Sequence, residues 1–557
     1  MYKRNDSYKQ QDLFGIKNSL SAKQERIWNN SIENCFFEQI FKKINQDRFK
    51  VLYSEKKSRP NVAVNQLVGS LILKHLFNWT YEDLFRNLHF NLLTRHAIGL
   101  QHLQEDVFSE ASIFNFQNRV IEHFVRTGED LLTEVFDRLT TSQLKEFGIM
   151  TDIQRGDSFL LGSNIFDYTR LQLLIEVILR LYRNLDTIDK ERFSELLSKY
   201  TKQTSGQYVF RIKKEDLPKE SQTLAKIYHD LFIMANNKYS DHRAFKIFER
   251  VYYEHFIVVE DKIELLPANT LTSDSLMSPD DDQATFRKKG KIKSKGYSGH
   301  ISETANPENK LNLITDVITV PNNTDDARIL EERLPTMIEK TSDLNEYHAD
   351  GSYGSPTVDL MMEDQDITQV QTAVRGKRPH AKMSIKEDES EEVYWVKCEY
   401  GQKVKAEKAN KGKNVKRHKA VFDYQTCLQC PLKDKCSSRI TGVKINRPKR
   451  TWYFSEEKIR LHKRLQNFEK LPEERQKIRA NVEATVKELK RGVKNGKVRV
   501  RSYVRVGCYL TFTSIAVNLT RIHKYVLKSN RNMLRMALIT RIHALLNLQN
   551  EPLISSN

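Results

Sequence analysis

Residues 346–354 read Glu-Tyr-His-Ala-Asp-Gly-Ser-Tyr-Gly, a short run that ends in an aspartate directly before a glycine-containing turn. This pattern predicts a strand at 346–350 and a tight turn at 351–354. Around it lie further runs of both kinds, namely strand-like runs at 296–303, 311–320 and 367–374 and helical runs at 325–340 and 356–364. Strands that alternate with helices predict a mixed α/β domain.

The rest of the chain divides into parts of different character. Residues 147–163 alternate and predict the strand that begins the α/β domain, whereas 267–295 is predicted to be a linker or loop. A break at 78–80 resembles the corner of a helix–turn–helix, although such corners also serve plain packing. The predicted parts are a helical N-terminal domain at 1–145, an α/β core at 146–384 with a helical insertion at about 168–255, a Cys-containing basic insertion at 385–450, and a C-terminal part at 451–557 that begins with a long helix at about 455–491.

The composition excludes several classes of protein. The chain has 557 residues, and no apolar run approaches the roughly 18–20 residues that cross a bilayer, so no membrane partner is expected. The N-terminus lacks the apolar stretch of a secretory signal, and six cysteines are too few for a disulfide scaffold. A cytoplasmic protein is therefore expected. The sequence also lacks a Walker-type loop and a Rossmann glycine fingerprint, so nucleotide hydrolysis is not expected to supply energy.

Positive charge is concentrated in one block of the sequence. The whole chain has 91 Lys and Arg against 72 Asp and Glu, a net charge of +19. Residues 397–510 hold 32 basic against 11 acidic residues, which is +21, so the remainder (59 against 61) carries −2. A domain-sized positive field favours a polyanionic partner, because each neutralised phosphate releases counterions.

Three carboxylates are the candidates for chemistry. Asp157 lies in the strand-like stretch 147–163, and Asp350 ends the strand before the glycine turn. Open α/β sheets bind ligands at the carboxyl ends of strands, so these two side chains are expected to converge. Asp152 is the alternative first carboxylate, but its odd separation from Asp157 places it on the opposite face of a regular strand.

Glu483 is the third candidate, in the middle of the long helix predicted at 455–491. Arg479 lies four residues before it and Lys490 seven residues after it. At about 100° per residue, both cations fall on the helical face that carries Glu483. A carboxylate between two cations suits the binding of a metal ion together with phosphate.

These residues resemble motifs of the DDE transposases of bacterial insertion sequences. Asp157-Ser158, with the later Ser163-Asn164-Ile165 and Arg170–Leu174, resembles the first-aspartate region of that family. Residues 349–354 resemble the second-aspartate motif, and Arg479, Glu483 and Lys490 match the family's Arg–(three residues)–Glu–(six residues)–Lys signature. That signature usually opens with a tyrosine three residues before the arginine, where this chain has Gln476.

The resemblance implies a ribonuclease-H-like catalytic core with a helical N-terminal domain and two insertions. It implies that Asp157, Asp350 and Glu483 hold Mg²⁺, for which Mn²⁺ can substitute, and that Arg479 and Lys490 bind DNA phosphates. Such a protein binds double-stranded DNA at its element's ends, cuts it and joins the ends to target DNA, as a homodimer at the nucleoid of a bacterial cytoplasm. A catalytically decayed DNA-binding relative and a stand-alone nuclease of the same fold remain alternatives.

Four cysteines form a second constellation. Cys427 and Cys430 have the Cys-x-x-Cys spacing that places two thiolates on one Zn²⁺, and Cys436 and Cys398 can complete a tetrahedral set, with His418 as the alternative to Cys398. Nearby lysines are expected to favour the thiolate forms. The zinc would be structural, and unligated buried thiols are the alternative.

A third constellation is basic. Residues 498–505 alternate and predict an extended segment with Arg499, Arg501 and Arg505 on one face. Together with a cluster in the basic insertion these side chains would follow a DNA backbone without reading its sequence; the cluster is Lys411, Lys413, Lys416, Arg417 and Lys419. A charged edge strand that discourages aggregation is the alternative reading.

Overall fold

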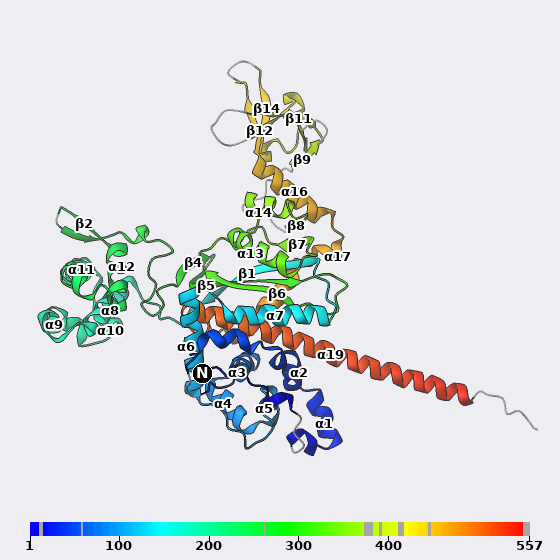
Figure 1. Ribbon diagram of the computed structural model, residues 1–557. Coiled ribbons are helices and arrows are strands. Elements are labelled where there is room, and N and C mark those ends of the chain that lie inside the picture. Colours follow the sequence, from blue (N-terminus) through cyan, green and yellow to red (C-terminus); the bar gives the residue numbers. More distant parts are fainter. Residues whose placement is uncertain are drawn as a thin grey trace, which may run out of the picture.

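The computed structural model describes residues 1–10, 15–56, 60–260, 262–371, 383–388, 393–409, 417–443 and 447–549. Figure 1 shows a central sheet above a helical N-terminal body, a helical arm to one side, a β-lobe at the far end, and a long C-terminal helix that leaves the body. Lys411, Lys413 and Lys416 lie outside the described residues, so their predicted role is untested.

The first part is helical, as the sequence predicts. Its helices are α1 (Ala22–Asn29), α2 (Ile32–Gln39), α3 (Val64–Leu76), α4 (Tyr81–Phe90), α5 (Leu92–Ala97), α6 (Glu110–Thr127) and α7 (Leu131–Glu146). The corner between α3 and α4 is real: Asn78 has φ 54° and the Thr80 side chain caps α4. Asparagine tolerates the left-handed conformation, and threonine satisfies a free N–H at the helix start.

The central sheet is mixed, which confirms the predicted α/β class. Its long strands are β1 (Ile153–Gly162), β5 (Ile292–Thr304) and β6 (Ile314–Pro321), and its short strands are β4 (Thr285–Lys289), β7 (Glu346–Ala349) and β8 (Thr368–Gln371). β5 pairs antiparallel with β1, β4 and β6, whereas β1, β7 and β8 run parallel. The spatial order β6-β5-β1-β7-β8 places β1 at the centre.

Helices cover both faces of this sheet. One core joins Phe159 and Ile301 of the sheet to α3, α7 and α18 (Val482–Leu489) and to α19 (Tyr503–Gln549). A second core packs α13 (Asp326–Lys340) and α14 (Pro356–Glu363) around Tyr347 of β7. Figure 1 shows α7 and α19 side by side beneath the sheet, and α19 has contacts with both α7 and β6.

The predicted loop at 267–295 is wrong over its last third. Residues 285–304 form a β-hairpin, in which Lys289 of β4 pairs with Ile292 of β5. Gly290, with φ 61°, makes the tight turn that joins the strands. The lysine-rich composition conceals the strand pattern, because the outer half of this hairpin is exposed and has no apolar face.

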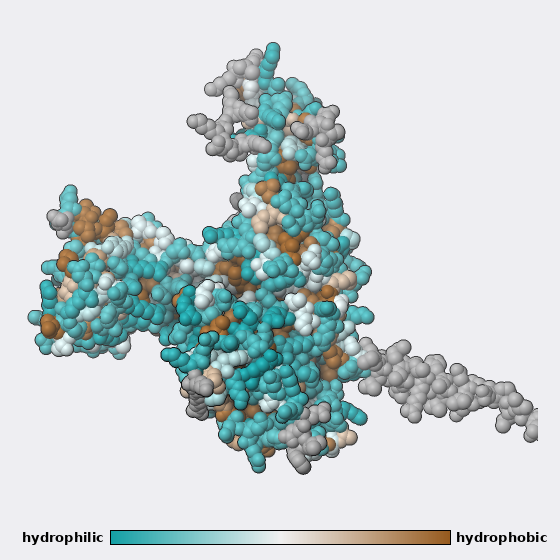
Figure 2. Space-filling view, viewed as in Figure 1, coloured by the Kyte–Doolittle hydropathy of each residue, from teal (hydrophilic) through white to brown (hydrophobic). Residues whose placement is uncertain are grey.

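The insertion after β1 is the predicted helical one. It contains α8 (Arg170–Asn184), α9 (Thr187–Thr201), α10 (Ser205–Arg211), α11 (Leu217–Tyr239) and α12 (Arg243–His255), followed by the hairpin β2 (Phe256–Val259) and β3 (Lys262–Leu265). It has a separate hydrophobic core. Figure 2 shows an apolar patch at the tip of this arm, formed by the half-exposed Ile257, Val258 and Val259 of β2.

The basic insertion is a small antiparallel β-lobe, which the sequence did not reveal. Its strands are β9 (Met383–Asp388), β10 (Val393–Cys398), β11 (Lys403–Lys408), β12 (Arg417–Phe422), β13 (Arg439–Thr441) and β14 (Lys449–Ser455), in the order β13-β14-β12-β11-β10-β9, with the short helix α15 (Tyr424–Leu428). Its core is small and is built around Val396, Phe422 and Trp452.

The long helix predicted at 455–491 is interrupted. The chain forms α16 (Glu456–Lys470), α17 (Glu473–Gln476), a 3₁₀ turn at Arg479–Asn481, α18, and another 3₁₀ turn at Lys490–Gly492. α16 ends before Pro472, whose ring disfavours helical backbone in the preceding residue. In the part of the chain that the structure describes, no helix combines the length and apolarity that a membrane span needs.

The buried amide of Asn518 hydrogen-bonds α19 to the sheet, which makes a test of the fold. Asn518 accepts a hydrogen bond from N of Ile314 (2.8 Å) and donates one to O of Ile314 (2.9 Å). Asn518→Ala leaves two buried backbone groups unpaired and should lower the free energy of unfolding by about 2–4 kcal/mol, measured by denaturant titration. Thr520→Ala, which removes only a bond to α19's own Ala516, should cost less than about 1 kcal/mol. Equal losses would contradict this account.

Candidate functional site

Three carboxylates from distant parts of the chain meet around one arginine. Nη2 of Arg479 lies 3.1 Å from Oδ2 of Asp157 and 3.9 Å from Oδ2 of Asp350. Nη1 of the same guanidinium lies 3.4 Å from Oε1 of Glu483. The sequence-predicted set is therefore gathered in one place, on β1, after β7 and at the start of α18.

Strand register explains why the two aspartates are neighbours. β1 and β7 are parallel, with Arg155 level with His348, and continuing this register by two residues places Asp157 level with Asp350. The sequence analysis expected Asp157 at the end of a strand, but it lies in the middle of β1. The site forms there because β7 has only four residues and ends beside the middle of its longer neighbour.

The environment of the carboxylates differs strongly. The side chain of Asp157 is 15% exposed, that of Asp350 30% and that of Glu483 72%. Burial raises the pKa of Asp157, the Arg479 guanidinium opposes this shift, and the Asp350 carboxylate adds to it. A buried carboxylate beside a second one is electrostatically costly, and a cation relieves that cost.

A fourth carboxylate, Asp326, positions the first two. It lies in the first turn of α13 and accepts hydrogen bonds from Oγ of Ser158 (2.6 Å) and Oγ of Ser352 (2.7 Å). Ser158 directly follows Asp157, and Ser352 lies two residues after Asp350. The backbone N of Ser352 donates to Asp350 at 2.8 Å, and its single hydroxyl proton is shared between Asp326 and Asp350. Sequence reasoning missed Asp326, because an aspartate in a first helical turn is commonly only a helix-terminal charge.

A buried ion cluster positions the segment that carries Arg479 and Glu483. Glu303 of β5 is fully buried, and it pairs with Arg155 (2.7 Å) and Arg521 (2.8 Å) and accepts from Thr485 of α18 (2.8 Å). Arg155 also donates to O of Ile478 at 3.0 Å, directly before Arg479. Sequence reasoning missed this cluster, since the partners of Glu303 lie 148, 182 and 218 residues away from it in the chain.

The site's donor atoms suit a hard divalent cation. Carboxylate oxygens are the ligands that Mg²⁺ prefers, and here they already converge on a positive group. Over the described ranges no three His, Cys, Asp or Glu side chains are placed to hold a metal ion, because a guanidinium stands between these three. Asp157, Asp350 and Glu483 therefore supply the kind of oxygen atom that such an ion prefers, but they surround the Arg479 guanidinium and, among the described residues, form no metal-binding group.

Lys490 does not lie on the same helix as Glu483, although the sequence predicted one continuous helix for both. It lies in the 3₁₀ turn after α18, so the predicted continuous helical face with Arg479 and Glu483 is wrong. Its Nζ lies 5.2 Å from the centre of the Phe159 ring, two residues from Asp157. Burial, followed by the charge of Lys289, lowers the pKa of Lys490, which Asp157 partly opposes.

The three other predicted arginines do not share one face. Arg501 pairs with Asp280 at 3.1 Å, and Arg505 donates to Asn118 of α6 at 3.3 Å. Arg499 lies near Lys74 of α3, whose pKa is lowered by burial and then by this arginine. The predicted extended segment is wrong beyond Ser502, because α19 begins at residue 503.

Asp152 lies apart from the carboxylate cluster. Both of its carboxylate oxygens accept from Nδ2 of Asn306, at 2.8 and 3.0 Å. It also precedes β1, and its backbone O accepts from N of Asn345 and N of Glu346. These contacts give Asp152 a structural role where β1 and β7 begin.

The four predicted zinc cysteines line one small cavity in the β-lobe. Cys398, Cys427, Cys430 and Cys436 surround a space of about 30 Å³ with mainly apolar walls. His418 is not among the lining residues, since its Nε2 lies 2.9 Å from Glu456. Burial raises the pKa of Cys427, which opposes the expected stabilisation of its thiolate by nearby lysines.

The four thiols are the kind of ligand that zinc prefers, but their positions in the structure do not form a metal-binding group among the described residues. Four sulfur donors around one enclosed space are the ligand set of a structural zinc site. The described side chains are nonetheless not gathered into a metal-binding group, and Cys436 lies 3.1 Å from the Ser438 hydroxyl instead.

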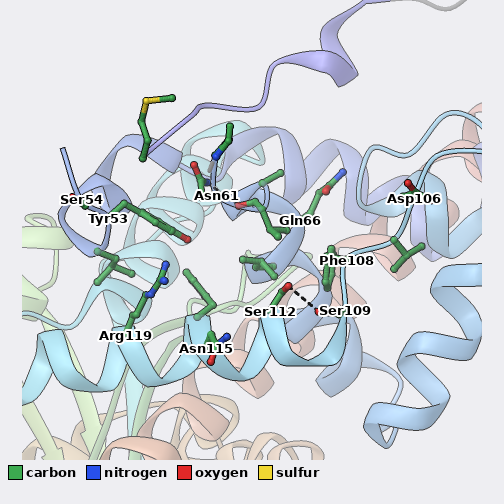
Figure 3. A pocket seen from close by; sticks show the side chains of 18 residues that line it. Tyr53, Ser54, Asn61, Gln66, Asp106, Phe108, Ser109, Ser112, Asn115 and Arg119 are labelled. Carbon is green, nitrogen blue, oxygen red and sulfur yellow. Dashed lines mark hydrogen bonds between the residues drawn. The ribbon is translucent and has the colours of Figure 1, made fainter. Parts of the chain in front are cut away.

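Another cavity lies in the N-terminal helical domain. It has a volume of about 990 Å³, and Figure 3 shows Arg119, Asn115 and Ser112 lining it from one helix, opposite Tyr53 and Asn61. Its described lining holds one carboxylate, from Asp106, and one guanidinium, from Arg119. A single carboxylate offers no counterpart to the converging acids described above.

Comparison with known families places two segments of the chain. Residues 397–523 match the family model described as a transposase DDE domain, and residues 26–119 match that described as a transposase domain, DUF772. The first segment includes Glu483 and the cysteines, whereas Asp157 and Asp350 lie outside both. No curated protein and no solved structure matches the chain.

The raised pKa of Asp157 leads to a prediction about stability. A raised folded-state pKa in an acid means that stability falls as pH rises through that pKa. In EDTA at pH 7, Asp157→Asn should therefore melt at or above the wild-type temperature, and the difference should vanish as pH falls below the ordinary range of aspartate. Calorimetry with and without Mg²⁺ should also show that the variant loses metal-dependent stabilisation. Asp152→Asn is the control that should keep it, and the opposite pattern would contradict the site.

Proposed function

We propose that this chain, which belongs to the DDE transposases of insertion sequences, binds the ends of its mobile element and catalyses metal-dependent cleavage and strand transfer. The single observation that carries the proposal is the convergence of Asp157, Asp350 and Glu483 on one cation. Exchange of one phosphodiester for another needs no nucleotide hydrolysis, which agrees with the absence of nucleotide-binding motifs from the sequence.

The proposed catalytic core is ribonuclease-H-like. Three antiparallel strands, β6, β5 and β1, are followed in space by the parallel strands β7 and β8, and helices cover both faces. The acids come from the central strand, from the end of its parallel neighbour and from a late helix. This order supports the proposal. The helical insertion enters between β1 and β4, and the β-lobe enters between β8 and α18, so neither changes the order.

Each residue has a proposed part in the reaction. Asp157, Asp350 and Glu483 would hold Mg²⁺, or Mn²⁺ in its place, which activates the attacking oxygen and stabilises the leaving one. Arg479 would then bind a DNA phosphate, because the carboxylates no longer need its charge. Lys490 would bind a neighbouring phosphate, and Asp326 would hold both aspartates through Ser158 and Ser352.

The other proposed contacts concern the whole DNA complex. The N-terminal helices would bind the element end, and Arg499 and Arg505 lie where the C-terminal part meets those helices. Arg501, which pairs with Asp280, would contact the DNA from beside the helical arm. Pairing of two ends calls for a homodimer on DNA. Because its proposed substrate is the double-stranded DNA of the element and of the target, we expect the protein to act at the nucleoid.

The proposed chemistry is tested by removing single charges. Asp157→Asn, Asp350→Asn and Glu483→Gln should each abolish nicking and joining of element-end DNA in Mg²⁺, because an amide keeps the size but loses the charge that holds the ion. Binding of end DNA in EDTA should change little. The products are followed on denaturing gels with a labelled end duplex and a target plasmid.

Asp152→Asn is the matched control for the first carboxylate and should cut normally. A dead Asp152→Asn with an active Asp157→Asn would overturn the assignment. Nicks without joined products would favour the stand-alone nuclease, and binding without nicks in the wild type would favour a decayed relative.

We propose in addition that the four lobe cysteines hold a structural Zn²⁺. The small core of the β-lobe supports this, since Val396, Phe422, Trp452 and a few neighbours bury little apolar surface. Metal binding and folding of such a lobe form one equilibrium, because an unfolded chain offers no formed site. The zinc would hold the basic lobe in shape and take no part in the reaction at Asp157.

Purified protein should contain about one zinc per chain by elemental analysis, as expected for one tetrahedral site. Cys430→Ser should lower both zinc content and DNA affinity, and binding should weaken steeply with salt. Cys35→Ser, a change in the N-terminal domain, is the control that should keep the zinc. Zero zinc in an active wild-type preparation would contradict the proposal.

A further inference from the structure

A basic cleft adjoins the carboxylate site along the second half of β1. Its volume is about 450 Å³, within the roughly 300–1,000 Å³ range of ligand pockets. The walls come from β1, the β4–β5 hairpin and the loop after α18. Six of its lining side chains are cationic, namely Arg287, Lys289, Lys293, Lys295, Lys490 and Lys497, and one, Asp167, is anionic.

The single carboxylate cannot balance these cations. Asp167 lies 3.5 Å from Nζ of Lys295 and 2.8 Å from Nζ of Lys497, so it is shared by two lysines. Within the described part of the chain, no carboxylate lies within 4 Å of Lys289, Lys293 or Lys490. The lining charge is therefore +6 − 1 = +5. Asp326, which lies outside the lining, offsets one further charge because it is 3.8 Å from Nη2 of Arg287, and an anionic ligand would relieve the repulsion that remains.

The cleft starts at the reacting centre and leads away from it in one direction. Its lining begins at Ser158, beside Asp157, and continues through Phe159 and Leu160 to Gly162. The far end is fixed by the backbone, because Gly162 donates to O of Gly496 and accepts from N of Val498, both at 2.9 Å. Lys289 is close enough to both Asp157 and Lys490 to influence their pKa values.

We infer that this cleft binds the phosphodiester backbone of the DNA strand on one side of the reacting phosphate. The inference rests on the proposed function, because it takes the carboxylates as the place where that phosphate reacts. Lys289 and Lys293 of the β4–β5 hairpin are its new phosphate contacts, and Lys490 connects the cleft to the carboxylate site.

The composition of the walls favours a backbone over a base or a free nucleotide. Lysine ammonium groups act as point charges that bind phosphate, and they lack the planar fork that reads a base edge. Separate cations from β4, β5 and the segment after α18 fit a repeating anion. A nucleotide site of the common kind would need a glycine-rich loop, which the sequence lacks.

The test measures binding of end DNA in EDTA, so it does not depend on cleavage. Lys289→Gln should reduce the slope of log affinity against log salt by about 0.9, the value for one lost phosphate contact in duplex DNA. Lys291→Gln is the matched control, since Lys291 lies in the turn of the same hairpin, is exposed and does not line the cleft. Its slope should stay at the wild-type value.

Neutral methylphosphonates then locate the contact. Replacing phosphates one at a time on each side of the cleavage point should weaken wild-type binding at positions on one side, and Lys289→Gln should show no further loss at one of them. Equal losses for Lys289→Gln and the wild type at every position would overturn the inference, as would an unchanged salt slope.

The two proposals fail separately. If the wild-type protein cuts and joins DNA but the methylphosphonate effect does not depend on Lys289, the proposed function stands and the proposed phosphate contact in the cleft is wrong. A wild-type protein that neither cuts nor joins, yet shows this dependence on Lys289, would remove the proposed function and keep the cleft as a DNA contact.

Discussion

One guanidinium holds together the three acids on which the rest of the site depends. Arg479 contacts Asp157, Asp350 and Glu483, which come from segments separated by about 190 and 130 residues. Like charges this close repel, and burial of Asp157 strengthens the effect, as its raised pKa indicates. The arginine thus supplies the positive charge that lets the three carboxylates lie close together.

The cluster keeps its shape because Glu303, a fully buried carboxylate outside it, is paired. Glu303 pairs with Arg155 and Arg521 and also accepts from Thr485, so α18 is tied to the centre of the sheet. Removing one partner from such a set leaves an unpaired buried charge, which costs far more than an exposed ion pair contributes. Positioning of Glu483, whose own side chain is 72% exposed, therefore depends on residues beneath it.

The sequence predicts the parts of this structure that depend on local pattern. Alternation and turn residues revealed β1, β7 and the Asp350 turn, and spacing revealed Arg479 and Glu483. It did not reveal Asp326 or Glu303, because their roles depend on contacts between distant segments. The hairpin at 285–304 was missed because its exposed half has no apolar face. The break before α17 was also missed, although Pro472 disfavours a helix in the residue before it.

The same reasoning explains why the insertions are compatible with the site. The helical arm leaves after β1 and returns at β4, and the β-lobe leaves after β8 and returns through α16, so both enter where strands end. Each has its own hydrophobic core, which means that neither needs the sheet's core for stability. The parallel register of β1 and β7 and the pairing of Glu303 are therefore left undisturbed, and together with Arg479 and Asp326 these two features fix where the three carboxylates meet.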